Sequence, residues 1–78
     1  MTNLEKYNQA FIDTFAISND QLENLAYQSI EAWDSVGHMS LIAALEEAFD
    51  IMFETDDIID FSSYQHGKEI IKKYDVEL

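Results

Sequence analysis

The stretch that decides the fold is WDSVGHMSLIAALEEAFD, residues 33–50. Its second half, residues 43–48, contains only Ala, Leu and Glu, which are strong helix formers. Asp34 or Ser35 can cap the start, because a short polar side chain accepts hydrogen bonds from the free backbone N–H groups of a first turn. We therefore expect a helix from Asp34 to about Asp50.

Wound at about 100° per residue, this helix presents an apolar face to the core. That face comprises His38, Leu41, Ile42, Leu45 and Phe49, with Met39 at its edge. His38 follows Ser35 by three residues, but nucleophilic catalysis also needs an orienting group, an oxyanion hole and a pocket. We expect His38 to be a hydrogen-bonded, partly buried residue and not a catalytic base.

The opposite face of the same helix is small and shallow, and it mixes apolar with acidic residues. Its members are Val36, Ser40, Ala43, Glu46, Glu47 and Asp50. A face that only meets solvent is more often polar throughout, so the pattern suits a docking surface as well as a solvated one. Both interpretations stay open on the pattern alone.

Upstream, apolar residues recur at three- and four-residue steps and predict a helix over residues 3–15, capped by Thr2 or Asn3. The stripe consists of Leu4, Tyr7, Phe11 and Phe15, with Ile12 beside it. Residues 16–33 then lose this periodicity and predict a long connection, a feature that is often functional or contains a helical turn. Its isolated apolar residues should pack against a bundle: Ile17, Leu22, Leu25, Tyr27, Ile30 and Trp33.

Two helices are expected downstream. Thr55 can cap a short one, with acidic residues in its first turn. Ser62 or Ser63 can cap a last helix, whose final turn contains Lys72 and Lys73. Its packed residues should be Tyr64, Ile70, Ile71 and Tyr74, with Gly67 in close contact with a neighbour. The expected fold is all-α: one domain, residues 1–78, forming a small four-helix bundle with a long loop between the first two helices and a short third helix.

The composition narrows the classes of function. Sixteen Asp and Glu against four Lys leave a net charge of -12, which opposes binding to nucleic acid and favours partners with basic patches. The charge is also explained by solubility alone. No cysteine is present, and no segment has the ligand order of an EF-hand, so we expect no specific metal site. Neither a signal peptide nor an apolar run of about 20 residues is evident, which predicts a cytoplasmic protein without a membrane span.

Residues 33–50 resemble the region around the phosphopantetheine attachment site of acyl carrier proteins. The likeness rests on Asp34 and Ser35 followed by a hydrophobic residue, on the pair Leu41 and Ile42, and on the ending LEEAFD, residues 45–50. It extends to the order of the expected helices over nearly the whole chain.

The resemblance implies that Ser35 receives 4′-phosphopantetheine from coenzyme A, and that Asp34 belongs to the motif recognised by a metal-dependent phosphopantetheinyl transferase. The thiol of the arm would hold a cargo as a thioester, so the cofactor supplies the sulfur. The protein itself would be a monomeric carrier and not an enzyme. A cargo-loading ligase and acyl- or aminoacyl-processing enzymes with basic patches would grip the docking face. A cavity for an acyl chain would be lined by Ile42, Leu45, Phe49, Ile58 and Phe61.

The chain departs from fatty-acid-synthesis carriers at three positions. Gly37 and Ser40 stand where those carriers commonly have acidic residues, and Trp33 replaces a small residue. The WDSVGHM form looks more like specialised stand-alone carriers of surface polysaccharide, secondary metabolite or aminoacyl pathways. We expect Trp33 to pack the long loop against the bundle. The alternative is an unmodified acidic adaptor that binds a basic partner, and the two hypotheses differ at the Ser35 hydroxyl.

Overall fold

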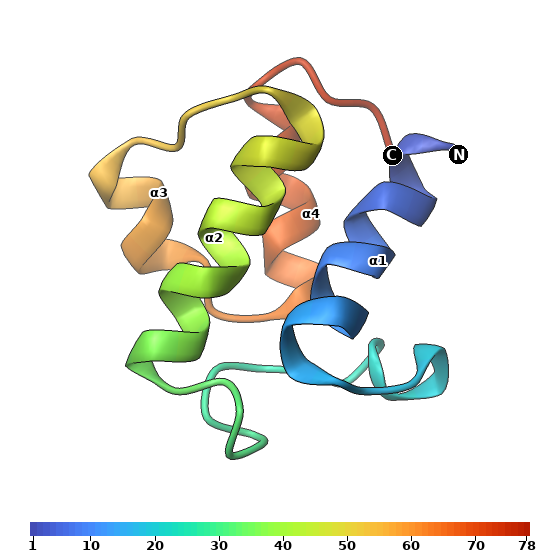
Figure 1. Ribbon diagram of the computed structural model, residues 1–78. Coiled ribbons are helices and arrows are strands. Elements are labelled where there is room, and N and C mark those ends of the chain that lie inside the picture. Colours follow the sequence, from blue (N-terminus) through green and yellow to red (C-terminus); the bar gives the residue numbers. More distant parts are fainter.

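The computed structural model describes every residue from 1 to 78, and its regular structure is entirely helical (Figure 1). The elements are α1 (Asn3–Phe15), a 3-10 turn (Asn19–Gln21), α2 (Ser35–Phe49), α3 (Thr55–Asp60) and α4 (Tyr64–Lys72). The predicted all-α fold, with a long loop before α2 and a short third helix, is confirmed.

The helices surround one core. In Figure 1, α4 lies behind α1 and α2, α3 sits at the outer side of α2, and the long loop runs beneath the bundle. Both termini meet at the opposite end, where the side-chain amide of Asn3 donates to the carbonyl of Glu77 at 2.9 Å. The loop end and the terminal end are therefore two distinct ends of the molecule.

Helix α1 begins with a capping box: Thr2 accepts from the Glu5 N–H at 3.1 Å, and the Glu5 carboxylate accepts from the Thr2 N–H at 3.0 Å. Tyr7, Phe11 and Phe15 are buried as predicted. The expectation for Leu4 was wrong, since 38% of that residue is exposed. The first turn lies beside the chain ends at the edge of the bundle, so the buried stripe starts at Tyr7.

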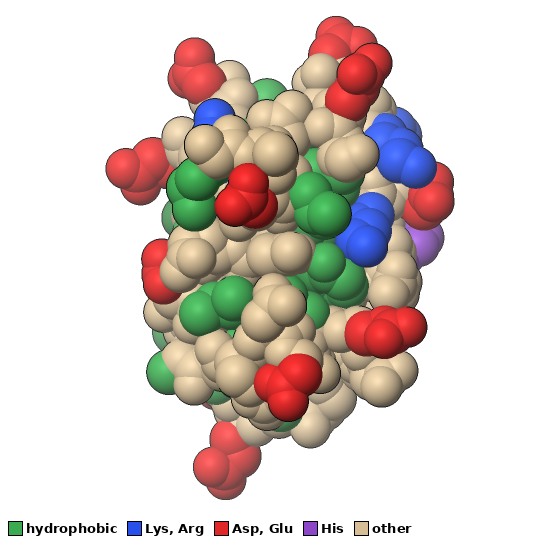
Figure 2. All heavy atoms as spheres, turned by 90° about the vertical axis from the view of Figure 1, so that its right-hand side faces the viewer, with side chains coloured by type: hydrophobic (Ala, Val, Ile, Leu, Met, Phe, Trp, Pro, Cys, Tyr) green, Lys and Arg blue, Asp and Glu red, His purple; other side chains and the backbone are tan.

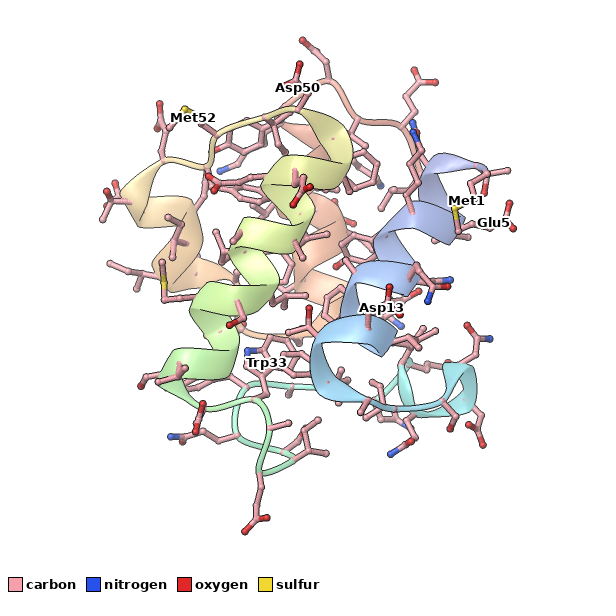
Figure 3. All side chains as sticks on the ribbon, viewed as in Figure 1. Met1, Glu5, Asp13, Trp33, Asp50 and Met52 are labelled. Atoms are coloured by element: carbon pink, nitrogen blue, oxygen red, sulfur yellow. The ribbon has the colours of Figure 1, made fainter.

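Aromatic rings fill the centre of the bundle. Trp33 is fully buried, and Figure 3 shows it between α1 and α2 at the loop end. Its ring stacks on Phe15 at a centroid distance of 5.3 Å, and Phe11 meets its edge at 5.8 Å. The Tyr7 hydroxyl donates to the Tyr64 carbonyl at 2.7 Å. Trp33 thus anchors the long loop to the helices, as predicted.

Leu22 and Leu25 are also buried, whereas Ile17 and Ile30 are half-buried. Tyr27 differs from the expectation, because 37% of it is exposed. The backbone on both sides of Tyr27 pairs with the start of α4: the Tyr27 N–H donates to the Ser62 carbonyl, and the Tyr64 N–H to the Leu25 carbonyl, each at 2.9 Å. This pairing sets the direction of the loop and leaves the Tyr27 ring at the surface.

Helix α2 buries Leu41, Ile42 and Leu45 and half-buries His38 and Phe49. The placement of Met39 at the edge of the core was wrong, since 52% of it is exposed. The core face of α2 is narrower than winding predicts, because Met39 faces an open pocket between α2 and α3 instead of the packed core.

Helix α3 starts at Thr55, and Glu54 occupies the N-cap position without a side-chain cap. The prediction that Thr55 is the cap was wrong, because that residue already has helical geometry. Ser63 caps α4 by accepting from the His66 N–H at 3.0 Å. Lys72 lies in the last turn of α4 as predicted, whereas Lys73 is the C-cap residue and Tyr74 follows the helix.

Gly67 has the close packing that its position inside a helix suggested. A Cβ atom there would lie 2.3 Å from the Phe61 ring and 2.4 Å from the Tyr7 hydroxyl. The missing side chain therefore lets α4 approach the aromatic core.

One face of the surface is seen in Figure 2, where apolar side chains gather in the middle and acidic side chains lie around the outline and also within the face. Lys68 belongs to the few cations, and its ammonium lies over the Tyr64 ring at 4.6 Å. None of the helices combines the length and the apolar character needed to cross a bilayer.

Candidate modification site at Ser35

Ser35 is the first residue of α2, and its side chain is exposed. The cap of this helix is Asp34: its carboxylate accepts from the Gly37 N–H at 2.8 Å, and its carbonyl accepts from the His38 N–H at 2.7 Å. The Ser35 hydroxyl therefore does not cap the helix and is accessible to solvent.

The surroundings of Ser35 favour an anion. Its own N–H and that of Val36 donate to no group of the chain. These two donors stand at the positive end of the α2 dipole, where a phosphate is stabilised. The Tyr27 hydroxyl lies 3.1 Å from Ser35 Oγ, at hydrogen-bonding distance. A phosphodiester on Ser35 would thus meet two backbone donors and one phenol.

A pocket of about 380 Å³ opens beside Ser35. The long loop, α2, α3 and the segment before α4 build it together. It is lined by Tyr27, Ser35, His38, Met39, Ile58, Ile59, Phe61 and Ser62. Its rim is partly apolar and open to solvent, since Met39 and Ile59 are 52% and 72% exposed.

A relay of hydrogen bonds runs along the inner side of this pocket. The Trp33 indole N–H donates to Nδ1 of His38 at 2.9 Å, and Nε2 of His38 lies 2.7 Å from the Ile58 carbonyl. Because Nδ1 accepts, the ring is neutral with its proton on Nε2, which donates to Ile58. His38 is therefore hydrogen-bonded at both nitrogens, as expected, and it joins the loop, α2 and α3.

The predicted docking face is exposed at all but one position. Val36 is 77% exposed, and Ser40, Ala43, Glu47 and Asp50 also face solvent. Figure 3 shows Asp50 at the far end of α2 from Trp33, so the face runs the length of the helix.

Glu46 is the exception. It is half-buried, and its carboxylate accepts from the Phe53 N–H at 2.9 Å. Its contact fixes the turn after α2, and this residue belongs to the scaffold instead of the docking face.

The residues predicted to line an acyl cavity are not brought together. Ile42 and Leu45 are 2% and 0% exposed within the packed core, and Phe49 is half-buried against it. Only Ile58 and Phe61 border the pocket beside Ser35. The prediction is corrected accordingly: α2 turns Ile42 and Leu45 toward the aromatic rings and not toward the gap next to α3.

The structure explains why residue 37 is a glycine. A Cβ atom at this position would lie 1.9 Å from the carbonyl oxygen of Ala32, which is backbone and cannot swing aside. The loop before α2 passes so close that no side chain fits. The absence of an acidic residue two places after Ser35 thus follows from the path of the loop.

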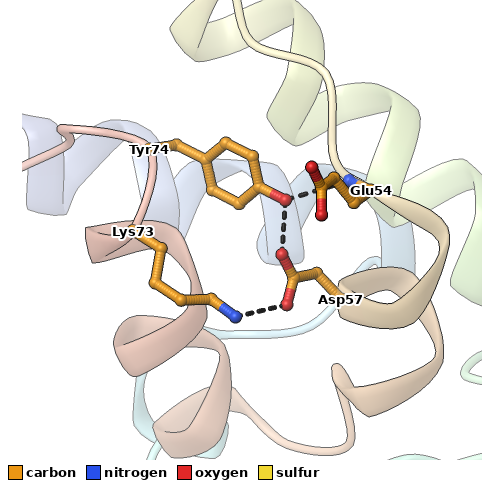
Figure 4. Close-up of polar contacts among 4 residues, drawn as sticks. All are labelled: Glu54, Asp57, Lys73 and Tyr74. Atoms are coloured by element: carbon orange, nitrogen blue, oxygen red, sulfur yellow. Dashed lines mark hydrogen bonds and ion pairs between the residues drawn. The ribbon is translucent and has the colours of Figure 1, made fainter.

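Helix α3 is held to the end of α4 by a charged cluster (Figure 4). Asp57 accepts from the Lys73 ammonium and from the Tyr74 hydroxyl, each at 2.5 Å, and the Tyr74 oxygen accepts from the Glu54 N–H at 2.9 Å. The hydrogen bonds from Lys73 and Tyr74 lower the pKa of Asp57, and the same contact with Asp57 raises the pKa of Lys73. Desolvation, followed by the hydrogen bond to Asp57, raises the pKa of Tyr74.

Several residues around Ser35 were not singled out from the sequence. Tyr27 is eight residues upstream in a loop without periodicity, so no pattern links it to Ser35. Ile59 follows Ile58 in a helix of six residues, and the two cannot both face the core. That adjacency was a usable signal for an exposed apolar residue.

No group of three or more His, Cys, Asp and Glu side chains is arranged to hold a metal ion. In comparisons with known proteins, the chain matches no family model, no curated protein and no solved structure.

Proposed function

We propose that this protein is a carrier that holds an acyl or aminoacyl group as a thioester on a 4′-phosphopantetheine arm attached to Ser35. The observation that carries the proposal is the position of the Ser35 hydroxyl. It is exposed at the start of α2, released from capping by Asp34, and beside an apolar pocket. The sequence resemblance of residues 33–50 to acyl carrier proteins points to the same atom.

The residues present fit a phosphate-linked arm. The N–H groups of Ser35 and Val36 are free to bind phosphate oxygens, and the Tyr27 hydroxyl is within reach of the attachment atom. Beyond the phosphate, Met39 and Ile59 offer apolar surface for the aliphatic part of the arm. When attached, the arm supplies the thiol on which the cargo is carried.

The chain's own contribution is presentation, not catalysis. His38 is engaged at both nitrogens and is not available as a general base for Ser35. Attachment therefore requires a separate transferase, with coenzyme A as the donor. The net charge of -12 on the carrier favours binding to enzymes with basic patches. These enzymes would approach the docking face, which consists of Val36, Ser40, Ala43, Glu47 and Asp50.

We place this carrier in a specialised pathway, because Gly37 and Ser40 leave the start of α2 without the acidic residues that carriers of fatty-acid synthesis commonly have there.

The test is an intact-mass measurement. The purified protein is incubated with coenzyme A, Mg²⁺ and a promiscuous phosphopantetheinyl transferase. We expect a gain of one phosphopantetheinyl group, and no gain in the Ser35→Ala variant. That variant is a sound control, since Asp34 provides the cap and the lost contact with Tyr27 is exposed, so the free energy of unfolding should change by less than about 1 kcal/mol.

Asp34→Ala is the complementary variant. It removes the cap and should lower the free energy of unfolding by about 1 kcal/mol in urea unfolding followed by circular dichroism.

If the folded wild-type protein gains no mass, the carrier proposal fails and the unmodified acidic adaptor becomes the better hypothesis. An adaptor would keep its partner binding in Ser35→Ala.

A further inference from the structure

The packed core of the bundle contains no cavity for cargo. Trp33, Phe11 and Leu45 are 0% exposed, and their neighbours pack ring against ring. Three pockets are present, and none of them is lined by Trp33, Ile42 or Leu45. An acyl chain could enter the core only if a helix moved aside.

Helix α3 is the shortest α-helix, so its displacement would open the bundle most easily. Polar contacts on both sides, however, hold it in place. On the α2 side, His38 donates to the Ile58 carbonyl at 2.7 Å. On the α4 side, Asp57 accepts from Lys73 and Tyr74, as Figure 4 shows. We call these links the α3 clamp: His38 with Ile58, and Asp57 with Lys73 and Tyr74.

The turn that leads into α3 is fixed as well. The Phe53 N–H donates to Glu46 at 2.9 Å, and the Glu54 N–H donates to Tyr74 at 2.9 Å. Moving α3 would break these bonds together with the α3 clamp, and it would leave the Ile58 carbonyl and the Nε2 of His38 without their present partners. A polar group that loses its hydrogen-bond partner and does not reach water costs free energy. The arrangement with α3 packed against α2 and α4 is therefore favoured.

The pocket that does exist adjoins Ser35 itself. The part of the arm nearest the phosphate reaches it first, whereas the cargo is bonded to the far end. Apolar surface on Met39, Ile58 and Ile59 therefore serves the arm before it serves any cargo.

We propose that this carrier does not take its cargo into the helical core, and that its cargo class is short or polar acyl groups, such as aminoacyl or small hydroxyacyl groups. A long alkyl chain left in water would be unfavourable, because its apolar surface stays exposed. This inference rests on the proposed attachment of the arm to Ser35.

The test compares thioester cleavage by hydroxylamine, which gives a hydroxamate and the free thiol, for two chain lengths. The transferase loads the protein from butanoyl-coenzyme A or octanoyl-coenzyme A, intact mass confirms each product, and release by hydroxylamine is followed over time. Free butanoyl- and octanoyl-pantetheine provide the intrinsic rates. We expect both loaded proteins to react at the rates of the free thioesters.

A bundle that sheltered the chain would give a different result. Each buried methylene shifts an equilibrium about fourfold, so the four extra methylenes of the octanoyl group would slow its release on the order of a hundredfold relative to butanoyl. That outcome would overturn this inference and leave the carrier function intact. Failure to load from coenzyme A would overturn the carrier function, and this inference with it.

The role of the α3 clamp has its own variant. Tyr74→Phe removes one hydroxyl that contacts both Asp57 and Glu54, and it keeps the ring that packs on Phe53 at 5.1 Å. With the α3 clamp weakened, α3 moves more easily, and the octanoyl thioester of this variant should react with hydroxylamine more slowly than that of the wild type. Equal rates in the two proteins would overturn the role assigned to the clamp.

Discussion

Position 37 shows what a single residue requires at the start of α2. Glycine weakens a helix interior by about 1 kcal/mol relative to alanine, so its presence here demands a reason. The reason is the Ala32 carbonyl oxygen, which would lie 1.9 Å from a Cβ atom. The same close approach brings the end of the loop, with Trp33, against the first turn of α2.

Gly37→Ala should therefore destabilise the protein despite alanine's better helix propensity. We expect the free energy of unfolding to fall by about 1–3 kcal/mol, the usual result of overpacking where the neighbour is backbone. Urea unfolding followed by the fluorescence of Trp33, the single tryptophan, measures the effect.

Ser40→Ala is the matched control, because Ser40 is exposed on the same helix and alanine there should stabilise by a few tenths of a kcal/mol. A Gly37→Ala protein as stable as the Ser40→Ala protein would show that the loop can move away from α2.

At the scale of an element, α3 depends on partners and not on its own sequence. Six residues without a side-chain N-cap are too few to form a stable isolated helix. Asp57 compensates by binding Lys73 and Tyr74, which connects α3 to the end of α4. The lowered pKa of Asp57 and the raised pKa of Lys73 predict how this connection responds to pH.

The sign of the effect follows from these shifts. Asp57 stabilises the fold above its ordinary pKa of 3.8, and this stabilisation is lost as the pH falls through the lowered pKa of the folded state. The contribution of Lys73 is fully present below its ordinary pKa of 10.5 and is lost as the pH rises through the raised pKa. The connection is therefore strongest between these limits.

Asp57→Asn should lower stability at neutral pH, and the difference from the wild type should shrink as the pH falls below 3.8. Urea midpoints of both proteins measured from pH 2 to pH 7, a range that spans the titration of carboxyl groups, isolate Asp57 from the other fifteen acidic residues, since those are shared. A difference that stays constant over this range would contradict the assigned pairing.

For the whole molecule, the dominant electrostatic feature is self-repulsion. The formal net charge is -12, and only two ion pairs are present: Asp57 with Lys73, and Glu69 with Lys72. Repulsion among exposed carboxylates is screened by salt, with a Debye length of about 10 Å at 0.1 M. The compact state is thus weakened most at low ionic strength.

The melting temperature should rise with sodium chloride between low and moderate concentrations. Glu47→Gln removes one exposed negative charge, so this variant should melt above the wild type at low salt and no longer differ at high salt. Differential scanning calorimetry checks both statements. A melting temperature of the wild type that ignores salt would show that repulsion is not a significant destabilising term.

The sequence determined the helices and much of the core, because periodic apolar residues and polar caps act within a few positions of one another. Such local signals predicted the span of α1 and the start of α2 at Ser35. The burial of Trp33 was also predicted from the sequence. Leu4 and Met39 were placed wrongly, since winding alone does not tell how far a neighbouring helix extends over a face. Thr55 was wrong as the cap because the helix begins one residue earlier than the capping pattern indicated.

Only the tertiary structure decided what surrounds Ser35. Met39 lies one helical turn after Ser35, but Tyr27 comes from the loop and Ile59 from α3, and no spacing in the chain links these two to Ser35. The tertiary structure also separates Ile42 and Leu45 from the pocket, because both side chains are buried in the core together with the aromatic rings. Local sequence determines where each helix begins and ends. The site depends on contacts between segments that are distant in the chain, and these contacts exist only once the bundle has packed.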